Sequence, residues 1–208
     1  CKSYKASRHT LRHALQTLEV AGLILRRQGA PAQVISRQKP RKFMQSFNSP
    51  ADILRYPRDT YRTNLIEEYV ELNDSTSKLV GAPVGSSWYH IGGVRKQEGS
   101  QQIIAWTDIY ILPQFAQLSR EPDHSQLMVF EQIEKKFGTK IDRAEVDVYA
   151  SKVGPIIAKY LKVKSGDPCL VIIRRYYDSR DQLFEITITY HPEDRYTYSM
   201  EFKGAATN

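Results

Sequence analysis

The sequence predicts an α+β fold in two parts, a small basic module followed by a larger antiparallel sheet with flanking helices. Residues 1–42 contain many lysines and arginines but a single acid, Glu19, whereas the rest of the chain is nearly balanced. From Phe43 onwards, long strand patterns occur in pairs, and helical patterns lie between the pairs. A chain of 208 residues has room for one sizeable core and a small second module.

Residues 7–23 predict an amphipathic helix. Its apolar residues, spaced by three and four positions, are expected to face a core: Leu11, Ala14, Leu15, Leu18 and Ala21. Ser7 is expected to cap the helix and Gly22 to end it. The opposite face is basic and rich in hydrogen-bonding groups, which suits the major groove of DNA, although a solvated basic face is the alternative. That face carries Arg8, His9, Thr10, Arg12, His13 and Gln16.

A basic hairpin is predicted directly after this helix. Strands are expected at Leu23–Leu25 and Gln33–Ile35, around a Gly29–Pro31 turn that Arg26 and Arg27 precede. A capped basic helix followed by a basic hairpin is the order of a winged helix-turn-helix, in which the helix enters the groove and the wing touches the backbone. Residues 1–36 are therefore predicted to be a DNA-binding domain, and residues 37–43, interrupted by Pro40, a linker.

These residues resemble the recognition helix and wing of GntR-type bacterial transcription regulators. The pattern Ser-Arg-x-Thr-x-Arg-x-Ala-Leu begins at Ser7, and Gly-Leu-Ile follows at Gly22. The resemblance implies DNA contacts by Arg8, Thr10, Arg12, Arg26, Arg27 and Gly29. The chain departs from the pattern at the wing tip, where Ala30 and Pro31 stand. Only Cys1–Ala6 precede the helix, so a truncated form of this domain is expected.

The second domain, predicted at residues 44–204, has two long hairpin patterns. The first joins strands Trp88–Lys96 and Gln101–Leu112, and the second turns at Asp178–Gln182. No sequence repeat is evident, but the two hairpins are expected to take equivalent places in one sheet. Trp88, Trp106 and Cys169 are expected in the core. Helices are predicted at Ser75–Leu79, Met128–Phe137 and Pro155–Leu161, and a further strand contains Glu145, Asp147, Tyr149 and Ser151.

This domain resembles the UTRA effector domain of the HutC-like branch of GntR regulators, which has a chorismate-lyase-like fold. The matching segments are "GAPVGSSWYHIGGVR", a strand ending "YILP", "AKYLKVKSGDPCLVIIRRYYD" and "FEITITYHPEDRYTYSMEF". The resemblance implies a small-molecule effector, often a sugar phosphate or a carboxylate. It also implies a homodimer in which the effector changes the spacing of the DNA-binding heads.

The candidate effector ligands are Arg95, Glu185, Tyr190 with His191 as its alternative, Tyr149 and Ser151. Arg95 matches a family arginine that binds an anionic group, and an arginine can hold a carboxylate or phosphate with two hydrogen bonds. An ion pair of Arg95 with Glu98, or of Glu185 with Arg95, is the alternative for each charged residue. Gly93 and Thr107 replace a family arginine and a family glutamate. Gly93 argues against a phosphate and favours a weaker anion, a neutral polar ligand or a larger molecule in the vacated space.

Two functions are compatible with the sequence. The first is a ligand-responsive repressor that binds double-stranded operator DNA as a homodimer in the cytoplasm. The second is a chorismate-lyase-like enzyme on the same scaffold. The sequence contains neither a nucleophile elbow nor a glycine-rich phosphate loop, which argues against an enzyme. The five histidines show no metal-ligand spacing, and no apolar run approaches the length of a membrane span, so neither a cofactor nor a membrane partner is expected.

Overall fold

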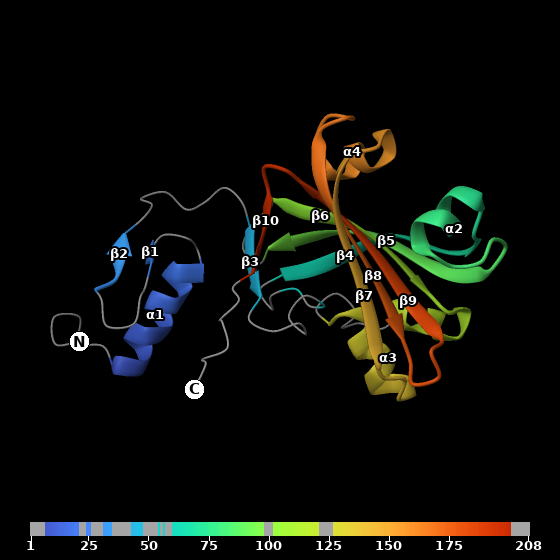
Figure 1. Ribbon diagram of the computed structural model, residues 1–208, viewed down its shortest axis with the longest axis horizontal. Coiled ribbons are helices and arrows are strands. Elements are labelled where there is room, and N and C mark those ends of the chain that lie inside the picture. Colours follow the sequence, from blue (N-terminus) through green and yellow to red (C-terminus); the bar gives the residue numbers. More distant parts are fainter. Residues whose placement is uncertain are drawn as a thin grey trace, which may run out of the picture. The chain divides into compact units, whose positions relative to one another are not determined.

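The computed structural model of the chain describes residues 7–20, 24–25, 31–34, 43–47, 54, 56, 60–97, 102–120 and 127–200. Contacts divide the chain into two compact units (Figure 1). Unit 1 comprises Cys1–Ile53 and Asp194–Asn208, and unit 2 comprises Leu54–Glu193. The predicted boundaries at residues 43/44 and 204 therefore differ from those of the compact units. The difference arises because β3 (Phe43–Phe47) pairs in parallel with β10 (Tyr196–Met200) and joins the two ends of the chain in unit 1.

Unit 1 contains the predicted helix and hairpin. Helix α1 spans Arg8–Val20, and the Ser7 hydroxyl accepts a hydrogen bond of 3.0 Å from the backbone N–H of Thr10, which confirms the predicted cap. Strands β1 (Ile24–Leu25) and β2 (Gln33–Val34) pair antiparallel. The apolar stripe of α1 is less buried than expected, since Leu18 is 40% exposed and Ala14 is exposed. A pair of two-residue strands offers too little apolar surface to cover a helix of 13 residues.

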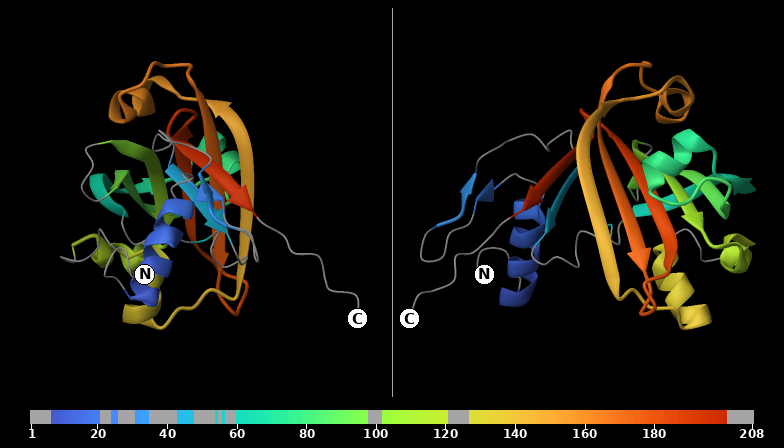
Figure 2. Two further views of the ribbon diagram at one scale, coloured as in Figure 1. Left: turned by 90° about the vertical axis from the view of Figure 1, so that its left-hand side faces the viewer. Right: turned by 45° about the vertical axis from the view of Figure 1, so that its right-hand side comes forward.

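Unit 2 is built on a six-stranded antiparallel sheet in the order β4-β5-β6-β9-β8-β7. Both predicted hairpins are confirmed, and they supply the four central strands. The edge strand β4 was not predicted, and the curved β7 forms the other margin (Figure 2). The strands are β4 (Thr60–Glu71), β5 (Ser87–Gln97), β6 (Ile103–Ile111), β7 (Arg143–Lys152), β8 (Pro168–Tyr177) and β9 (Leu183–Pro192). The helices are α2 (Asp74–Val80), the 3₁₀ helix η3 (Pro113–Arg120), α3 (Val129–Phe137) and α4 (Pro155–Leu161).

The two faces of the sheet are covered by different helices. Helices α2 and α4 pack on one face, called here the α2/α4 face, together with the predicted core residues Trp88, Trp106 and Cys169. On the other face, η3 and α3 contribute Phe115, Phe130 and Ile133 to a second core. Because side chains alternate along a strand, each strand sends half of its residues to each face. The face under α3 is the one that carries the candidate site.

The sheet consists of two similar halves, β4-α2-β5-β6 and β7-α4-β8-β9, which confirms the expected equivalence of the hairpins. The same backbone bonds occur in each half. Gly85 N–H donates to the Leu72 carbonyl at 2.8 Å, and Gly166 N–H donates to the Val153 carbonyl at 2.9 Å. Both glycines have positive φ, 77° and 90°, a conformation that L-residues with a side chain avoid. The halves share backbone geometry while their sequences have diverged.

A long-range contact joins the halves at the end of α2. Arg175, on β8, donates from Nε to the Val80 carbonyl at 2.6 Å and from Nη2 to the Leu79 carbonyl at 3.3 Å. Its Nη1 also lies 2.7 Å from a carboxylate oxygen of Asp147 on β7. The last carbonyls of a helix have no partner within it, so this arginine supplies donors that α2 lacks.

Candidate anion-binding pocket

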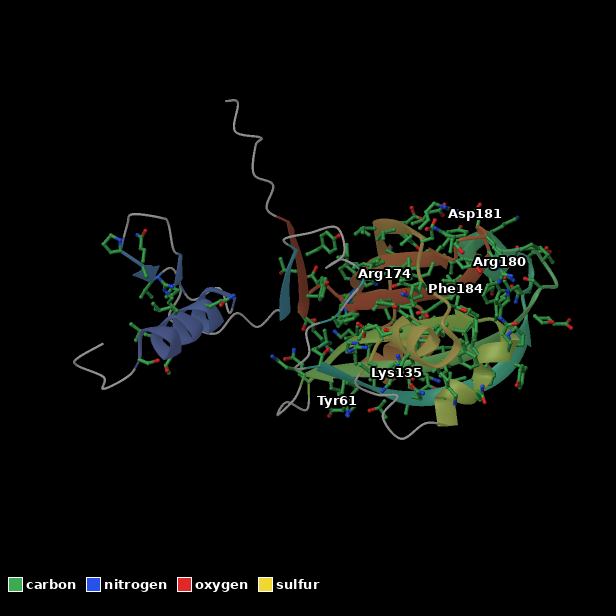
Figure 3. All side chains as sticks on the ribbon, turned by 90° about the horizontal axis from the view of Figure 1, so that it is seen from below. Tyr61, Lys135, Arg174, Arg180, Asp181 and Phe184 are labelled. Carbon is green, nitrogen blue, oxygen red and sulfur yellow. The ribbon has the colours of Figure 1, made fainter. Side chains whose placement is uncertain are left out.

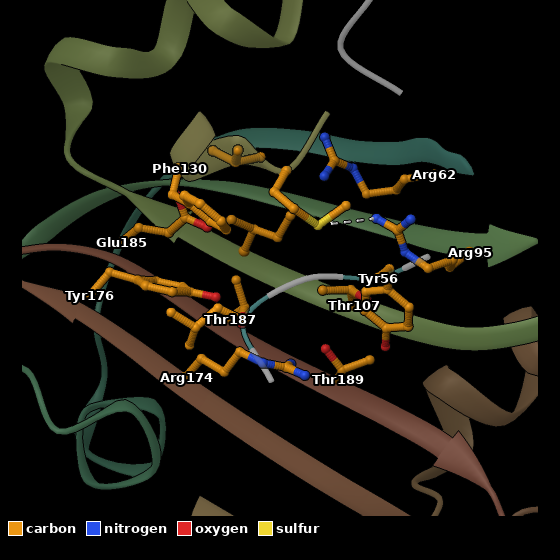
Figure 4. A pocket seen from close by; sticks show the side chains of 14 residues that line it. Tyr56, Arg62, Arg95, Thr107, Phe130, Arg174, Tyr176, Glu185, Thr187 and Thr189 are labelled. Atoms are coloured by element: carbon orange, nitrogen blue, oxygen red, sulfur yellow. Dashed lines mark hydrogen bonds between the residues drawn. The ribbon is translucent and has the colours of Figure 1, made fainter. Parts of the chain in front are cut away.

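A small pocket lies on the sheet face under α3, with a cavity volume of about 30 Å³ (Figure 4). A cavity of this size exceeds the space that one water molecule needs. Polar side chains from β4, β5, β6, β8 and β9 form its floor, and α3 with the residue before it forms its cover. The lining residues are Leu54, Tyr56, Arg62, Arg95, Thr107, Ile109, Met128, Val129, Phe130, Arg174, Tyr176, Glu185, Thr187 and Thr189.

Three buried arginines converge on this pocket. Arg62 and Arg95 are direct cross-strand partners on β4 and β5, and Arg174 projects from β8. Their relative exposures are only 3%, 3% and 2%. Figure 3 shows that Arg174 lies within the sheet domain, away from Arg180 and Asp181 at the β8–β9 turn. Arg62 donates from Nε to the side-chain oxygen of Asn64 at 2.8 Å. Arginine is seldom fully buried, so three in one pocket concentrate positive charge there to an unusual degree.

The hydrogen-bonding capacity of Arg95 is largely unused. Its Nη1 donates to the Thr60 hydroxyl at 2.9 Å, while Nη2 lies 4.0 Å from the Met128 sulfur. Its Nε has no hydrogen-bond partner, and no carboxylate in the described part of the chain pairs with it. Burial lowers the pKa of Arg95 to about 10, and the charges of Arg62 and Arg174 act in the same direction. The guanidinium is still protonated at neutral pH, so it presents a charged, unsatisfied donor to the pocket.

Glu185 is the single carboxyl group in the pocket lining, and it is 1% exposed. Burial raises its pKa to about 8, although the charge of Arg62 opposes the shift. Its Oε2 has no hydrogen-bond partner. The carboxyl is therefore mostly protonated at pH 7 and does not neutralise the arginines. The predicted alternative, a Glu185–Arg95 ion pair, is not observed among the described residues.

Tyr56 closes one end of the pocket from outside the sheet. Its hydroxyl oxygen lies 2.6 Å from Nε2 of His191, and its ring faces the Arg95 guanidinium, with Cζ 4.3 Å from the ring centroid. Burial raises the pKa of Tyr56 and, together with the charge of Arg174, lowers that of His191 well below its ordinary value. Both groups are therefore neutral at physiological pH, and neither offsets the charge of the Arg95 guanidinium.

The other predicted ligand residues lie away from this pocket. Tyr190 pairs with Trp106 and Val171 and packs on the α2/α4 face. Tyr149 and Ser151 lie on the edge strand β7, where Tyr149 is 39% exposed and Ser151 is exposed. Strand alternation sends them to the side opposite Glu185. Of the Tyr190 and His191 alternatives, His191 is the one on the pocket side, through its contact with Tyr56.

The space expected at Gly93 is not present. A Cβ atom at this position would lie 2.5 Å from the Thr63 carbonyl oxygen, because the backbone of β4 approaches closely at the bulge between Asn64 and Ile66. Arg62 and Arg174 bring positive charge to the pocket, although Gly93 stands where the family pattern has an arginine. Sequence reasoning missed both residues, although an arginine inside the apolar run "CLVIIRRYY" was a usable signal for Arg174.

The predicted DNA contacts are only partly within the described structure. Thr10 and Arg12 are exposed on α1, and the Thr10 hydroxyl lies 2.8 Å from that of Ser7. The side chain of Arg8 lies outside the described residues, as do Arg26, Arg27 and Gly29.

Comparison with known families decides the class of the larger unit. Residues 58–197 match the UTRA domain family. The chain belongs to this family. The UTRA match covers all six strands of the sheet and every pocket residue except Leu54 and Tyr56.

Curated relatives of this UTRA protein are named as repressors. The chain is 24% identical over 211 residues to the "Probable fructoselysine utilization operon transcriptional repressor" of Shigella flexneri and of Escherichia coli K12, covering 98% of this chain and 82% of each relative.

Solved structures share the fold at low identity. PhnF from Mycobacterium smegmatis aligns with a TM-score of 0.64 at 17% identity, covering 98% of this chain and 88% of that one. The C-terminal domain of the histidine utilization repressor from Pseudomonas syringae aligns with a TM-score of 0.59 at 17% identity, covering 70% and 99%. None of the described helices is long and apolar enough to cross a membrane, and the described residues contain no group of side chains able to hold a metal ion.

Proposed function

We propose that this protein is a ligand-responsive transcription repressor of the HutC-like GntR type, whose UTRA domain senses a small anionic metabolite. The observation that carries the proposal is the convergence of Arg62, Arg95 and Arg174 on a pocket whose one carboxyl group is protonated at neutral pH. An anion in the pocket would be attracted by these three guanidinium charges and could accept a hydrogen bond from the free Nε of Arg95.

In this proposal the basic segment of unit 1 is a winged helix-turn-helix that contacts operator DNA. The protein acts as a homodimer in the cytoplasm, because each DNA-binding head reads one half of a two-fold symmetric operator. An effector alters operator affinity only to the extent that it binds the two arrangements of the dimer differently. The names of the curated relatives support repression, and the charge of residues 1–42 supports a nucleic-acid partner.

The position of the charges also bears on the ligand. Because Arg62 and Arg174 replace the charge that Gly93 lacks, a phosphate ester again becomes a suitable effector alongside carboxylates. The neutral carboxyl of Glu185 and the Thr107 hydroxyl, whose oxygen has no hydrogen-bond partner, offer further hydrogen bonds to a polar body. A sugar or amino-acid derivative that carries one anionic group matches this arrangement.

The first test is direct calorimetric binding of a panel of anions to the full chain. The panel contains inorganic phosphate and sulfate, small dicarboxylates, sugar phosphates, histidine and fructoselysine derivatives. We expect micromolar to millimolar binding of one chemical class, lost in Arg174→Met and Arg95→Met and retained in Arg180→Met, which removes an exposed arginine outside the pocket. Binding that survives both pocket substitutions, or no binding by any anion, would refute the proposed sensor.

The enzyme alternative has its own readout. Chorismate is itself an anion, so binding alone does not separate a sensor from a lyase. Release of pyruvate from chorismate by the purified protein, lost in Arg174→Met, would overturn the regulator in favour of an enzyme. Binding without release supports the sensor.

A further inference from the structure

Tyr56 is the pocket residue whose position the sheet does not explain. It precedes β4, lies two residues after Leu54, the first residue of unit 2, and falls outside the match to the UTRA family. Its side chain nevertheless lies among the pocket arginines (Figure 4). The Arg95 Cζ is 4.3 Å from its ring centroid, and the Arg174 Cζ is 6.0 Å from it.

The contacts of Tyr56 constrain Arg95 in a particular way. The aromatic ring covers one face of the planar guanidinium, and the Thr60 hydroxyl holds one edge through Nη1. A guanidinium fixed by its face keeps its edge donors available, and Nε is such a donor with no partner. The Tyr56 ring is held in turn by a hydrogen bond of 2.6 Å between its hydroxyl and Nε2 of His191. Both groups are neutral, so one donates a proton and the other accepts it.

We propose that Tyr56 is a positioning residue that orients Arg95 for an anionic ligand. This inference rests on the proposed anion sensor and adds a residue that acts on the ligand through Arg95. An arginine that is already oriented loses less freedom when an anion binds, so the ring raises anion affinity through Arg95.

The arrangement also implies reciprocity. If the Tyr56 ring in its observed position raises the affinity for the anion by some factor, the bound anion must stabilise the ring in that position by the same factor. Tyr56 lies close in sequence to the point where the chain passes from unit 1 to unit 2. Ligand binding on Arg95 therefore holds the beginning of unit 2, beside one of the two points at which the chain passes between the units, the other being Glu193–Asp194.

The test is calorimetric titration of the full chain with inorganic sulfate and with inorganic phosphate, at constant ionic strength. Relative to wild type, Tyr56→Leu is expected to raise the dissociation constant about tenfold, because it removes the cation–π contact while keeping apolar volume. Tyr56→Phe keeps the ring and is expected to restore affinity to within about threefold of wild type. The matched control is Tyr69→Leu, which makes the same change at an exposed tyrosine of β4 outside the pocket.

A double-substitution cycle separates positioning from general loss of stability. Arg95→Lys cannot present the planar face that the ring covers, so its effect on sulfate binding and that of Tyr56→Leu should be less than additive. Unchanged or tighter binding in Tyr56→Leu would show that the ring competes with the anion, and would overturn the positioning role while leaving the sensor intact. Additive effects in the cycle would overturn the positioning role alone. Absence of sulfate and phosphate binding in the wild type would overturn it for these anions, and the sensor would fall with it only when every other anion of the panel fails to bind as well.

Discussion

Glu185 shows how a single buried residue sets the chemistry of the pocket. The apolar surroundings keep it protonated at pH 7, with Arg62 as the charge that acts on it and Tyr176 as its neutral cross-strand neighbour on β8. Burial raises the pKa of Tyr176 as well. A glutamic acid in this state donates a hydrogen bond instead of repelling an anion.

This state predicts a pH dependence of stability with a definite sign. The folded pKa of Glu185, about 8, lies above its ordinary value of 4.5, so the folded protein holds this proton more tightly than the unfolded chain. The contribution to the free energy of unfolding is complete below pH 4.5 and is lost as the pH rises through 8. Glu185→Gln, which mimics the protonated acid, should abolish this loss.

Thermal unfolding of the two proteins at several pH values provides the measurement. The midpoints should be similar near pH ~5 and should diverge up to pH ~9, with the wild type falling below the glutamine variant. Parallel curves across this range would mean that Glu185 is ionised in the folded protein.

At the scale of elements, α2 depends on a side chain from the other half of the sheet. The helix has its own caps, since Asn73 accepts from the Thr76 N–H at 2.9 Å and Gly81 ends the helix with a φ of 76°. Arg175 adds donors to the Leu79 and Val80 carbonyls. Without Arg175, the two carbonyls lose these hydrogen bonds at the place where α2 packs on the sheet.

Arg175→Met should lower the free energy of unfolding by about 2 kcal/mol, since hydrogen bonds to a charged donor are lost while the aliphatic stem remains. The control is Arg180→Met, at an exposed arginine that pairs with Asp178 at 3.3 Å and should change stability by less than about 0.5 kcal/mol. Urea unfolding of both variants measures the difference. Equal losses in the two variants would contradict the role assigned to Arg175.

How much the sequence predicts depends on whether the signal is local. The hairpins, helices α2, α3 and α4, and the buried Trp88 and Trp106 follow from periodicity and turn residues, and Arg95 and Glu185 follow from family resemblance. Arg62 and Arg174 could not be grouped with them, because only the strand order brings β4 and β8 to one pocket. Tyr56 belongs to no periodic pattern, so its contact with Arg95 carries no local signal.

At the scale of the whole molecule, positive charge is concentrated in residues 1–42, which contain one acid. The proposed wing arginines, Arg26 and Arg27, should bind DNA phosphates. Loss of two phosphate contacts lowers affinity at all sequences and reduces the slope of log K against log salt by about 1.8.

A duplex selected by the protein from a random pool provides the substrate for this test. Arg26→Ala with Arg27→Ala should weaken binding and flatten its salt dependence, whereas Lys135→Ala with Lys136→Ala, two exposed lysines of α3, should change neither. An unchanged salt slope in the arginine variant would exclude these residues from the DNA contact.

The two similar halves of the sheet bear on how such a pocket could arise. Alone, the half from β4 to β6 would leave β6 as an unpaired edge, which a second copy of the same half would cover in the way that β9 does here. Two identical copies would build a cavity whose rims are related by a two-fold axis, suited to a ligand with matching two-fold symmetry. Within one chain, the two rims can carry different residues. Gly93 lies eight residues after Gly85, and Arg174 lies eight residues after the matching Gly166. Of these two equivalent positions, only that of Arg174 carries a charge. A single chain with two similar halves can therefore place different side chains at the two rims, which suits a ligand whose two ends differ.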